Sequence, residues 1–312
     1  MPGTILITGA NSSLAIPAIQ HLLSTYPEYT AVLTVRNTAS TDAKHEQAAR
    51  SHRQILQGGN DGKLPPLASI VCNAYYWNLA GSEVERTPDG YEKAFQVNHI
   101  AHAALVLRLL GSFCSEGNAR VVLFSSDAHW PGKNSLEKYP PSIPEDLELP
   151  MKPPPDQTSD NVLGRGFQRY AVSKLAVVMW MCALNRYLER DPNLYNITAI
   201  AINPGNLSDS RALRVNTPPL LTLLSKFVIK PLQPLLRLVA DPTMRTAAEA
   251  GVDVIDLATN AAHPGERGYF TLLERDTSSP ESLDEETQQR LWTKTLEWAR
   301  ITRENTALAI DA

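Results

Sequence analysis

The stretch Thr4-Ile-Leu-Ile-Thr-Gly-Ala-Asn-Ser-Ser-Leu-Ala15 places a short apolar strand directly before a glycine turn and the beginning of a helical pattern. In a doubly wound α/β fold, this strand–turn–helix order presents backbone N–H groups to the phosphates of a dinucleotide. Gly9 is present for the turn, but Ser13 and Ala15 stand where close approach and tight packing favour glycine. Alanine is an accepted third residue of this pattern, whereas the Ser13 side chain either crowds a pyrophosphate or donates a hydroxyl to it. The turn alone is therefore a weak signal of dinucleotide binding.

Beyond this turn, short β-like apolar runs alternate with helical segments, which predicts a parallel sheet covered on both faces. The expected strands are Thr4–Thr8, Ala31–Val35, Ser69–Cys72, Arg120–Ser125, Ile197–Ile202 and Tyr269–Leu273. The expected helices are Leu14–Ser24, Ala43–Leu56, Tyr91–Leu110, Gln168–Arg190, Thr243–Leu257 (opened by Asp241-Pro242) and Asp284–Arg300. We therefore expect one doubly wound, Rossmann-type α/β domain over residues 1–312.

Two stretches interrupt this regular pattern. The first, Trp130–Asn161, is rich in proline and acidic residues, and we expect a surface insertion there. The second covers about residues 206–240; within it, Thr217–Val239 mixes many leucines with three basic residues and is interrupted by prolines. We expect an amphipathic helix pair that acts as a lid over an apolar substrate. A core helix pair and a surface that touches membrane are the alternatives.

Composition narrows the class of protein and of partner. A net charge of −4 over 312 residues gives no electrostatic reason to expect nucleic acid. Cys72, Cys114 and Cys182 lie in separate apolar runs, which indicates buried thiols in a reducing compartment. The first residues lack a signal-peptide pattern, and the longest apolar stretch is about half of the roughly 20 residues that span a bilayer. We expect a cytoplasmic protein with no integral membrane segment.

Tyr170-Ala-Val-Ser-Lys174 places a phenol and an ammonium four residues apart, on one face of a long predicted helix. A neighbouring cation stabilises phenolate and brings the tyrosine pKa towards working pH, so the pair suits proton transfer. An isolated pair with this spacing is more often a solvated surface pair. Here it stands between one strand that ends in Ser125-Ser126 and another that ends in Asn203-Pro-Gly205, and such strand ends meet at one rim of a parallel sheet.

In this order, these motifs make the chain resemble the short-chain dehydrogenase/reductase family, especially its retinol-dehydrogenase and 3-ketosteroid-reductase-like fungal branch. The motifs that carry the resemblance are Thr8-Gly9, Cys72-Asn-Ala74 in place of Asn-Asn-Ala-Gly, Val97-Asn98, Phe124-Ser-Ser126, Tyr170-x-x-x-Lys174, Asn203-Pro-Gly205, Gly268-Tyr-Phe270 and Leu291-Trp292.

The resemblance implies an NADP(H)-dependent ketoreductase, or the reverse alcohol dehydrogenase, acting on an apolar or secondary-metabolite substrate. It implies that Tyr170 donates a proton to the substrate carbonyl and that Ser126, with Ser125 as its nearest rival, hydrogen-bonds the same oxygen. Lys174 would lower the Tyr170 pKa and hold the nicotinamide ribose, and Asn98 would anchor a water that relays protons to Lys174. The cofactor-binding residues implied are Gly9, Asn11, Ser12, Ser13, Leu14, Arg36, Asn37, Asn73, Ala74, Asn98, Tyr170, Lys174, Pro204, Gly205, Leu207 and Ser208.

The chain also departs from the family pattern. Between Ser126 and Tyr170 lie 43 residues, more than is usual in the family, and we expect the extra length to lie beside the substrate entrance. Between Arg36 and Ser69 only one helix is evident, so we expect the third strand of the family to be missing or shortened. Arg36 stands where NAD enzymes carry an acidic residue, which favours the 2′-phosphate of NADP(H).

Several alternatives stay open at the level of the sequence. His99 and His102 have a spacing that can bind metal, but no third ligand is evident and we expect none. A dinucleotide-binding sensor or scaffold without redox activity, and an isomerase or cyclase that keeps NADP(H) as structure, compete with the ketoreductase. The resemblance makes a homodimer one option for the assembly.

Overall fold

A seven-stranded sheet forms the middle layer of the protein. The structure is a computed structural model that describes residues 2–36 and 64–309. Its strands are β1 (Thr4–Ile7), β2 (Thr30–Leu33), β3 (Leu67–Cys72), β4 (Ala119–Phe124), β5 (Ile197–Asn203), β6 (Gly268–Thr271) and β7 (Glu274–Arg275). They lie in the order β2-β1-β3-β4-β5-β6-β7, with β7 antiparallel to β6 and all the other described neighbours parallel. The doubly wound α/β fold expected from the sequence is confirmed.

The inner strands are apolar on both faces because helices cover both faces of the sheet. Every residue of β4 and β5 is buried, and their register pairs Phe124 with Ile202 at the carboxyl ends. On the other side of β4, β3 pairs with β1 so that Ile7 lies opposite Val71. The chain therefore leaves β1, β3, β4 and β5 at the same rim, where open α/β sheets bind their ligands.

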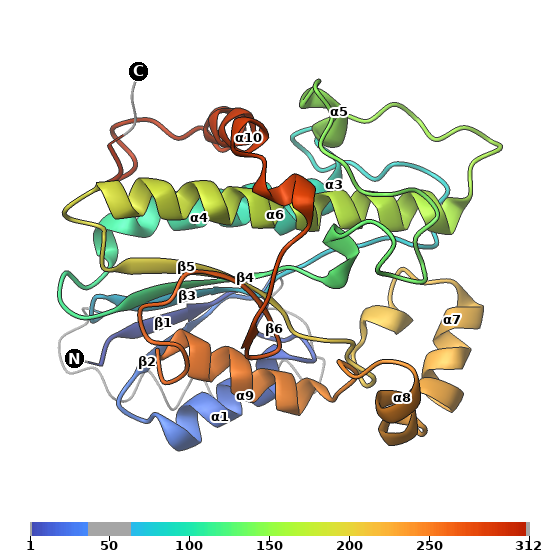
Figure 1. Ribbon diagram of the computed structural model, residues 1–312, viewed down its shortest axis with the longest axis horizontal. Helices are drawn as coiled ribbons and strands as arrows, with labels where there is room; N and C mark the ends of the chain where they lie inside the picture. The colour runs from blue at the N-terminus through green and yellow to red at the C-terminus, as the bar shows by residue number, and fades with distance from the viewer. Residues whose placement is uncertain (1, 37–63, 310–312) are drawn as a thin grey trace.

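Figure 1 shows the helices in layers above and below the sheet. The helices are α1 (Ala15–Thr25), α3 (Lys93–Phe95), α4 (Ala101–Leu109), α5 (Glu148–Met151), α6 (Val162–Arg190), α7 (Pro219–Leu224), α8 (Gln233–Val239), α9 (Ala247–Ala258) and α10 (Glu285–Trp298). Helices α4 and α6 cover one face, with α10 outside α6, and together with that face they form the larger apolar core. Helices α1 and α9 cover the other face and form a second core.

Shorter helical turns also occur in the described residues. The π-helical turn Gln96–Ile100 joins α3 to α4, and a second one, Ser225–Ile229, follows α7. Turns of 3-10 helix cover Leu110–Ser112, Asp127–His129, Ala212–Arg214 and Pro280–Leu283.

The expected elements and the observed ones differ at two places, and one expected region is not described. The helix expected over residues 43–56, and the region of the missing or shortened third strand, lie outside the described residues. The prediction that Asp241-Pro242 opens a helix is wrong: Asp241 accepts from the backbone N–H of Thr243, 2.9 Å away, and closes a local turn. Helix α9 begins later, where Thr246 and Glu249 form a reciprocal capping box. The short edge strand β7 was not expected.

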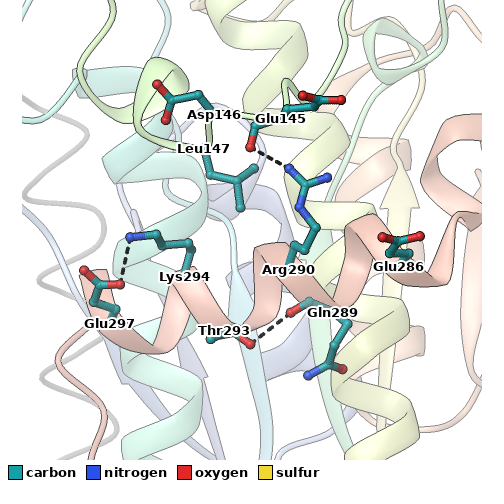
Figure 2. Close-up of a pocket in the computed structure, with 9 residues that line it drawn as sticks. All are labelled: Glu145, Asp146, Leu147, Glu286, Gln289, Arg290, Thr293, Lys294 and Glu297. Atoms are coloured by element: carbon teal, nitrogen blue, oxygen red, sulfur yellow. Dashed lines mark hydrogen bonds and ion pairs between the residues drawn. The ribbon is translucent and has the colours of Figure 1, made fainter.

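The insertion at residues 130–161 is less superficial than its composition suggested. It contains α5 and places the apolar side chains of Ile143, Leu147 and Met151 in the core beside α6 and α10. Between this insertion and α10 lies a cavity of about 690 Å³, shown in Figure 2, which is lined mostly by charged side chains. Arg290 closes one side of it by donating to the carbonyl of Glu145, 2.6 Å away. This cavity lies on the outer side of α10, away from the carboxyl rim of the sheet.

The segment 206–245 leaves the sheet and returns at one point. Leu207 forms a parallel bridge with Arg245, and the guanidinium of Arg245 donates to the carbonyl of Pro204 and pairs with Asp253. Within the segment the chain forms two short helices, α7 and α8, which Figure 1 shows at one side of the molecule, away from the sheet. A core helix pair is excluded, because most of their apolar side chains are exposed.

Within the described residues, no helix has the length and hydropathy that a membrane-spanning segment needs.

Candidate active site

The glycine turn after β1 has the backbone shape that its sequence predicts. Gly9 has a positive φ of 63°, which favours glycine, and a Cβ there would lie 2.9 Å from Cα of Ala74. The Asn73 side chain donates to the carbonyls of Thr8 and Gly9, at 2.8 and 3.0 Å, and so holds the end of β3 to the turn. Gly9, Asn73 and Ala74 therefore lie together, as the sequence predicted.

The rest of the turn is fixed by its serines. Ser12 accepts from the backbone N–H of Ala15 and shares a hydrogen bond with Asn73. Ser13, which departs from the glycine pattern, accepts from the backbone N–H of Arg211 at 3.0 Å. Leu14 is buried and begins α1. The Ser13 hydroxyl thus connects the glycine turn to segment 206–245, a role that its sequence position did not reveal.

Tyr170 and Lys174 lie on one face of α6. This helix begins at Asn161, whose side chain caps the N–H of Gly164 at 2.8 Å, and its middle is buried against the sheet. The Lys174 ammonium lies 5.5 Å from the centre of the Tyr170 ring and donates to the carbonyl of Phe124, at the end of β4, over 2.8 Å. The helix therefore brings both groups to the carboxyl rim of β4.

Burial dominates the ionisation of both groups. It lowers the pKa of Lys174 from 10.5 to about 7, because the ammonium is buried without a carboxylate partner among the described residues. It also raises the pKa of Tyr170 above its ordinary value, although a hydrogen bond with the Ser126 hydroxyl acts in the opposite direction. Desolvation is therefore the largest effect on the Tyr170 pKa, and the lowering by Lys174 that the resemblance implies stays a prediction.

The two serines after β4 have different environments. Ser125 is buried, and its hydroxyl donates to the backbone carbonyl of Lys174 at 3.3 Å. Ser126 is half-buried, donates to Asp127 at 2.8 Å and hydrogen-bonds with Tyr170. The geometry thus favours Ser126 over Ser125 as the serine beside the tyrosine.

Asn98 lies in the π-helical turn between α3 and α4, a feature that is frequent at functional sites. Its amide donates to the carbonyl of Tyr76 at 2.9 Å and to the hydroxyl of Ser173 at 2.8 Å. Ser173 in turn donates to the carbonyl of Tyr170 over 2.6 Å. Asn98 is therefore linked to the catalytic helix through Ser173, and no direct bond to Lys174 is present among the described contacts.

The remaining predicted cofactor residues that the structure describes lie around the same rim. Arg36 is exposed just after β2, and its charge lowers the pKa of the Tyr76 hydroxyl slightly against the larger effect of burial. Gly205 has a positive φ of 82°, and Pro204 and Ser208 bond to Arg245. Asn37 lies outside the described residues.

Sequence reasoning missed two residues beside the tyrosine and one beside the glycine turn. Trp77 packs edge-on against Tyr170, with ring centres 5.4 Å apart, and its indole donates to the carbonyl of Ala212 at 3.2 Å. Tyr75 stands where the family motif has glycine and lies close enough to Tyr170 to influence its pKa. The guanidinium of Arg211 bonds the carbonyl of Asn11 in the glycine turn. Only Tyr75 had a sequence signal, since it replaces the glycine of the Asn-Asn-Ala-Gly motif.

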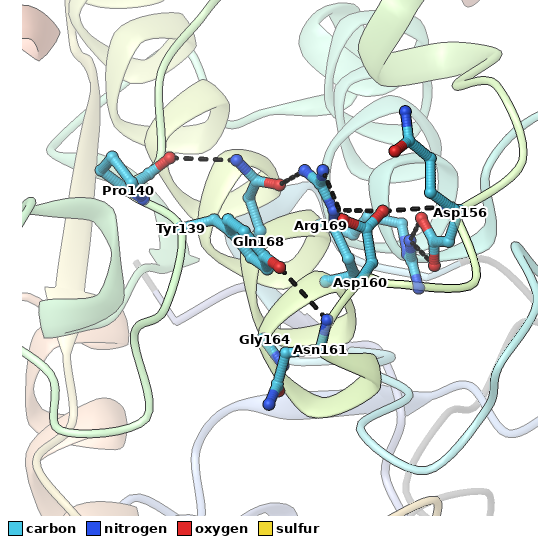
Figure 3. Close-up of polar contacts among 10 residues, drawn as sticks. Tyr139, Pro140, Asp156, Asp160, Asn161, Gly164, Gln168 and Arg169 are labelled. Carbon is cyan, nitrogen blue, oxygen red and sulfur yellow. Dashed lines mark hydrogen bonds and ion pairs between the residues drawn. The ribbon is translucent and has the colours of Figure 1, made fainter.

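The insertion between Ser126 and Tyr170 is hydrogen-bonded to the first turns of α6, as Figure 3 shows. Asp156 accepts two hydrogen bonds of 2.9 Å from Arg169, and both side chains are largely buried. The Tyr139 hydroxyl accepts from the backbone N–H of Asn161, and Gln168 donates to the carbonyl of Pro140. The insertion thus holds the residue next to Tyr170.

His99 and His102 do not form a metal site. His102 shares a 3.0 Å hydrogen bond with Thr8, His99 shares one of 2.9 Å with Thr295, and burial lowers their pKa values to about 4 and about 3. No group of three or more metal-ligating side chains occurs in the part of the chain that the structure describes.

Comparison with known proteins gives the class. The profile of the AcuH dehydrogenase domain matches residues 211–308. Dehydrogenase acuH of Aspergillus aculeatus is 56% identical over 30% of this chain and 95% of its own length. Short-chain dehydrogenase iccH of Talaromyces variabilis is 27% identical over 98% of both chains, and human retinol dehydrogenase 14 is 25% identical over 93% of this chain and 84% of its own.

Among solved structures, the NADPH-bound carbonyl reductase from chicken fatty liver has the same fold. It has a TM-score of 0.51 and 17% identity over 89% of this chain and 94% of its own. The protein belongs to the short-chain dehydrogenase/reductase family, as its motifs predicted. The matched region 211–308 contains none of Ser126, Tyr170 and Lys174.

Proposed function

We propose that the protein is an NADP(H)-dependent ketoreductase that reduces a ketone of an apolar or secondary-metabolite substrate, or oxidises the matching secondary alcohol. The observation that carries the proposal is the meeting of Ser126, Tyr170 and Lys174 at the rim where the glycine turn also lies. Related proteins named dehydrogenases, and a neighbour solved with NADPH, support it.

The glycine turn fits the phosphates of a dinucleotide. Within the described contacts, the backbone N–H groups of Ser13 and Leu14 have no protein acceptor, which leaves two donors free at the beginning of α1. Gly9 leaves space where a Cβ would crowd Ala74. Arg36, exposed after β2, is placed to bind a 2′-phosphate, and Lys174 to bind the nicotinamide ribose. Bound NADPH would supply the hydride.

The protein would supply the proton and hold the substrate. The raised pKa keeps Tyr170 protonated at working pH, which is the state a proton donor needs when a carbonyl oxygen becomes an alcohol. Ser126 would hydrogen-bond the same oxygen. Asn98, through Ser173, would fix the turn of α6 that carries Tyr170. Asn98 is thus proposed as a positioning residue.

The surroundings of Tyr170 suit an apolar substrate. Leu79 and Phe167 form a small apolar cluster with it, and Trp77 packs against the same ring. Segment 206–240 would cover this site as a lid, because its first part contacts both sides of it. Arg211 bonds the glycine turn, and Asn216 accepts from the backbone N–H of Leu79 at 2.8 Å.

The proposal is tested by titrating the protein with NADPH and then offering a panel of apolar ketones while NADPH absorbance is followed. Tyr170→Phe should keep cofactor affinity and lose turnover by about a hundredfold or more, because it removes only the donated proton. Tyr195→Phe, at a tyrosine that is 64% exposed, is the matched control and should behave as wild type.

Two outcomes would favour one of the competing functions over a ketoreductase. Tight NADPH binding without oxidation by any ketone would favour a sensor or scaffold. Substrate conversion without net consumption of NADPH would favour an isomerase or cyclase. Wild-type turnover by Tyr170→Phe would refute the catalytic assignment itself.

A further inference from the structure

An apolar stripe on the outside of segment 215–240 has no partner among the residues that the structure describes. Ten of the seventeen large apolar side chains that are exposed in the described residues lie in this short segment. The exposed fractions reach 76% for Leu220, 64% for Phe227 and 84% for Leu238. Such a concentration differs from the scattered exposed apolar residues that are normal on a soluble surface and indicates an interaction site.

The exposed residues share one side of the helical turns. In α7 and the following π-helical turn, four of them, Leu220, Leu223, Leu224 and Phe227, have the i, i+3, i+4, i+7 spacing of one helix face, and Val228 is exposed beside them. Ser225, which lies off this stripe, is completely buried. The helix therefore turns this apolar side to the outside, the reverse of a helix that packs on its own core.

The charge of the same segment is uniformly positive. Between Asp209 and Asp241 the chain has no acidic residue and five basic ones, in a protein whose net charge is −4. Lys226 and Lys230 are exposed within the stripe, and the exposed Arg237 of α8 pairs with Glu249 of α9. The surface thus combines apolar side chains with cations.

The combination of apolar side chains and cations indicates which kind of partner the stripe binds. A second copy of the chain seated on the stripe would add its own Lys226 and Lys230 to the same apolar interface without a compensating carboxylate from the stripe, which is unfavourable. A bilayer with anionic lipids accepts both features, since acyl chains cover the leucines while phosphate and carboxylate headgroups attract the lysines. The prolines that break the segment into α7 and α8 leave two short helices of the size that can lie at an interface.

We propose that segment 215–240 docks the protein on the surface of a membrane that contains anionic lipids, without crossing it. The docked segment adjoins the catalytic site, because the side chain of Asn216 donates to the carbonyl of Trp77, which packs on Tyr170. An apolar substrate dissolved in the bilayer would therefore reach the site over a short path. The docking itself does not depend on the reaction proposed above.

The test is co-sedimentation of the full-length protein with vesicles of phosphatidylcholine alone, or with about one-third phosphatidylserine. The protein should bind the anionic vesicles and lose binding at high salt. Lys226→Gln and Lys230→Gln should each weaken binding about fivefold. Leu220→Ser with Leu238→Ser should weaken it at least about tenfold. All four positions are exposed, so the variants should remain folded.

The matched controls carry the same changes outside the segment. Leu283→Ser, at a leucine that is 53% exposed, and Lys133→Gln should bind vesicles like the wild type. The proposal would be overturned if the protein did not bind vesicles. It would also be overturned if the protein bound equally with and without phosphatidylserine and the lysine variants did not change this binding. A third result would overturn it as well: sedimentation velocity that shows concentration-dependent self-association, which Leu220→Ser abolishes. That result would identify a second copy of the chain as the partner.

Discussion

Replacing Lys174 by methionine should make the cofactor-free protein more stable while removing its activity. The side chain is 4% exposed, and its hydrogen bond to the Phe124 carbonyl is the one polar contact described for its ammonium. Burial without a counter-charge lowers its pKa from 10.5 to about 7. That drop corresponds to about 5 kcal/mol of unfavourable ionisation in the folded state at pH 7 and below. Methionine avoids this cost but leaves the Phe124 carbonyl unpaired, which costs about 1–3 kcal/mol.

The net gain is therefore about 2–4 kcal/mol in the free energy of unfolding, and its dependence on pH has a definite sign. Between pH 7 and 10.5 the unfolded chain holds the Lys174 proton and the folded chain has released it. Wild-type stability consequently rises with pH across this window. The advantage of Lys174→Met is complete below pH 7 and is lost as the pH approaches 10.5.

Urea unfolding of both proteins without cofactor, at several pH values on either side of 7, measures this difference. Lys133→Met, at an exposed lysine, is the control and should show no such dependence. Parallel stability curves for the wild type and Lys174→Met, or a less stable variant below pH 7, would refute the reasoning. Turnover should fall in Lys174→Met regardless, since the ammonium that holds the ribose in the proposed mechanism is gone.

Three further outcomes follow from the site and its supports. Arg36→Ala should weaken NADPH binding about ten- to hundredfold and leave NADH binding almost unchanged in fluorescence titration; equal effects on both would contradict the phosphate role. Gly9→Ala should lower the unfolding free energy more than Gly132→Ala, because both have positive φ but only Gly9 has backbone within contact of a new Cβ; equal losses would refute the close approach. Asp156→Asn should destabilise the protein by about 1–2 kcal/mol and speed proteolysis of residues 130–161, because it removes the ion pair with Arg169; unchanged proteolysis would show that the ion pair does not hold the insertion.

The sequence predicted those parts of the protein that depend on local periodicity. Buried parallel strands are apolar over most of their length, so β4 and β5 were found within a residue or two of their ends. The four-residue spacing of Tyr170 and Lys174 on a long helix placed both groups on one face. Strand ends share one rim in a parallel sheet, so Ser126 was expected near them.

What the sequence did not predict rests on contacts between distant segments. Trp77 meets Ala212 across 135 positions, and Ser13 meets Arg211 across 198, so neither pairing leaves a local pattern. The raised pKa of Tyr170 was also not expected, because desolvation depends on how deeply the helix packs. The core residues of the insertion, such as Met151, were missed because proline and acidic residues surround them in the sequence.

The pairing of β5 with β6 makes the two parts of the chain depend on each other. The last third of the chain, which resembles acuH, supplies β6, and it also supplies the carbonyls of Leu257 and His263 to the buried guanidinium of Arg120 on β4. A chain divided near Ser210 would leave β5 with a bare edge and Arg120 with a buried charge that lacks these acceptors. The larger piece would carry the catalytic groups and the smaller piece the strand that completes the sheet. The interval between Ser210 and Pro219 is accordingly the natural place to split this enzyme into two halves that regain a fold only by associating.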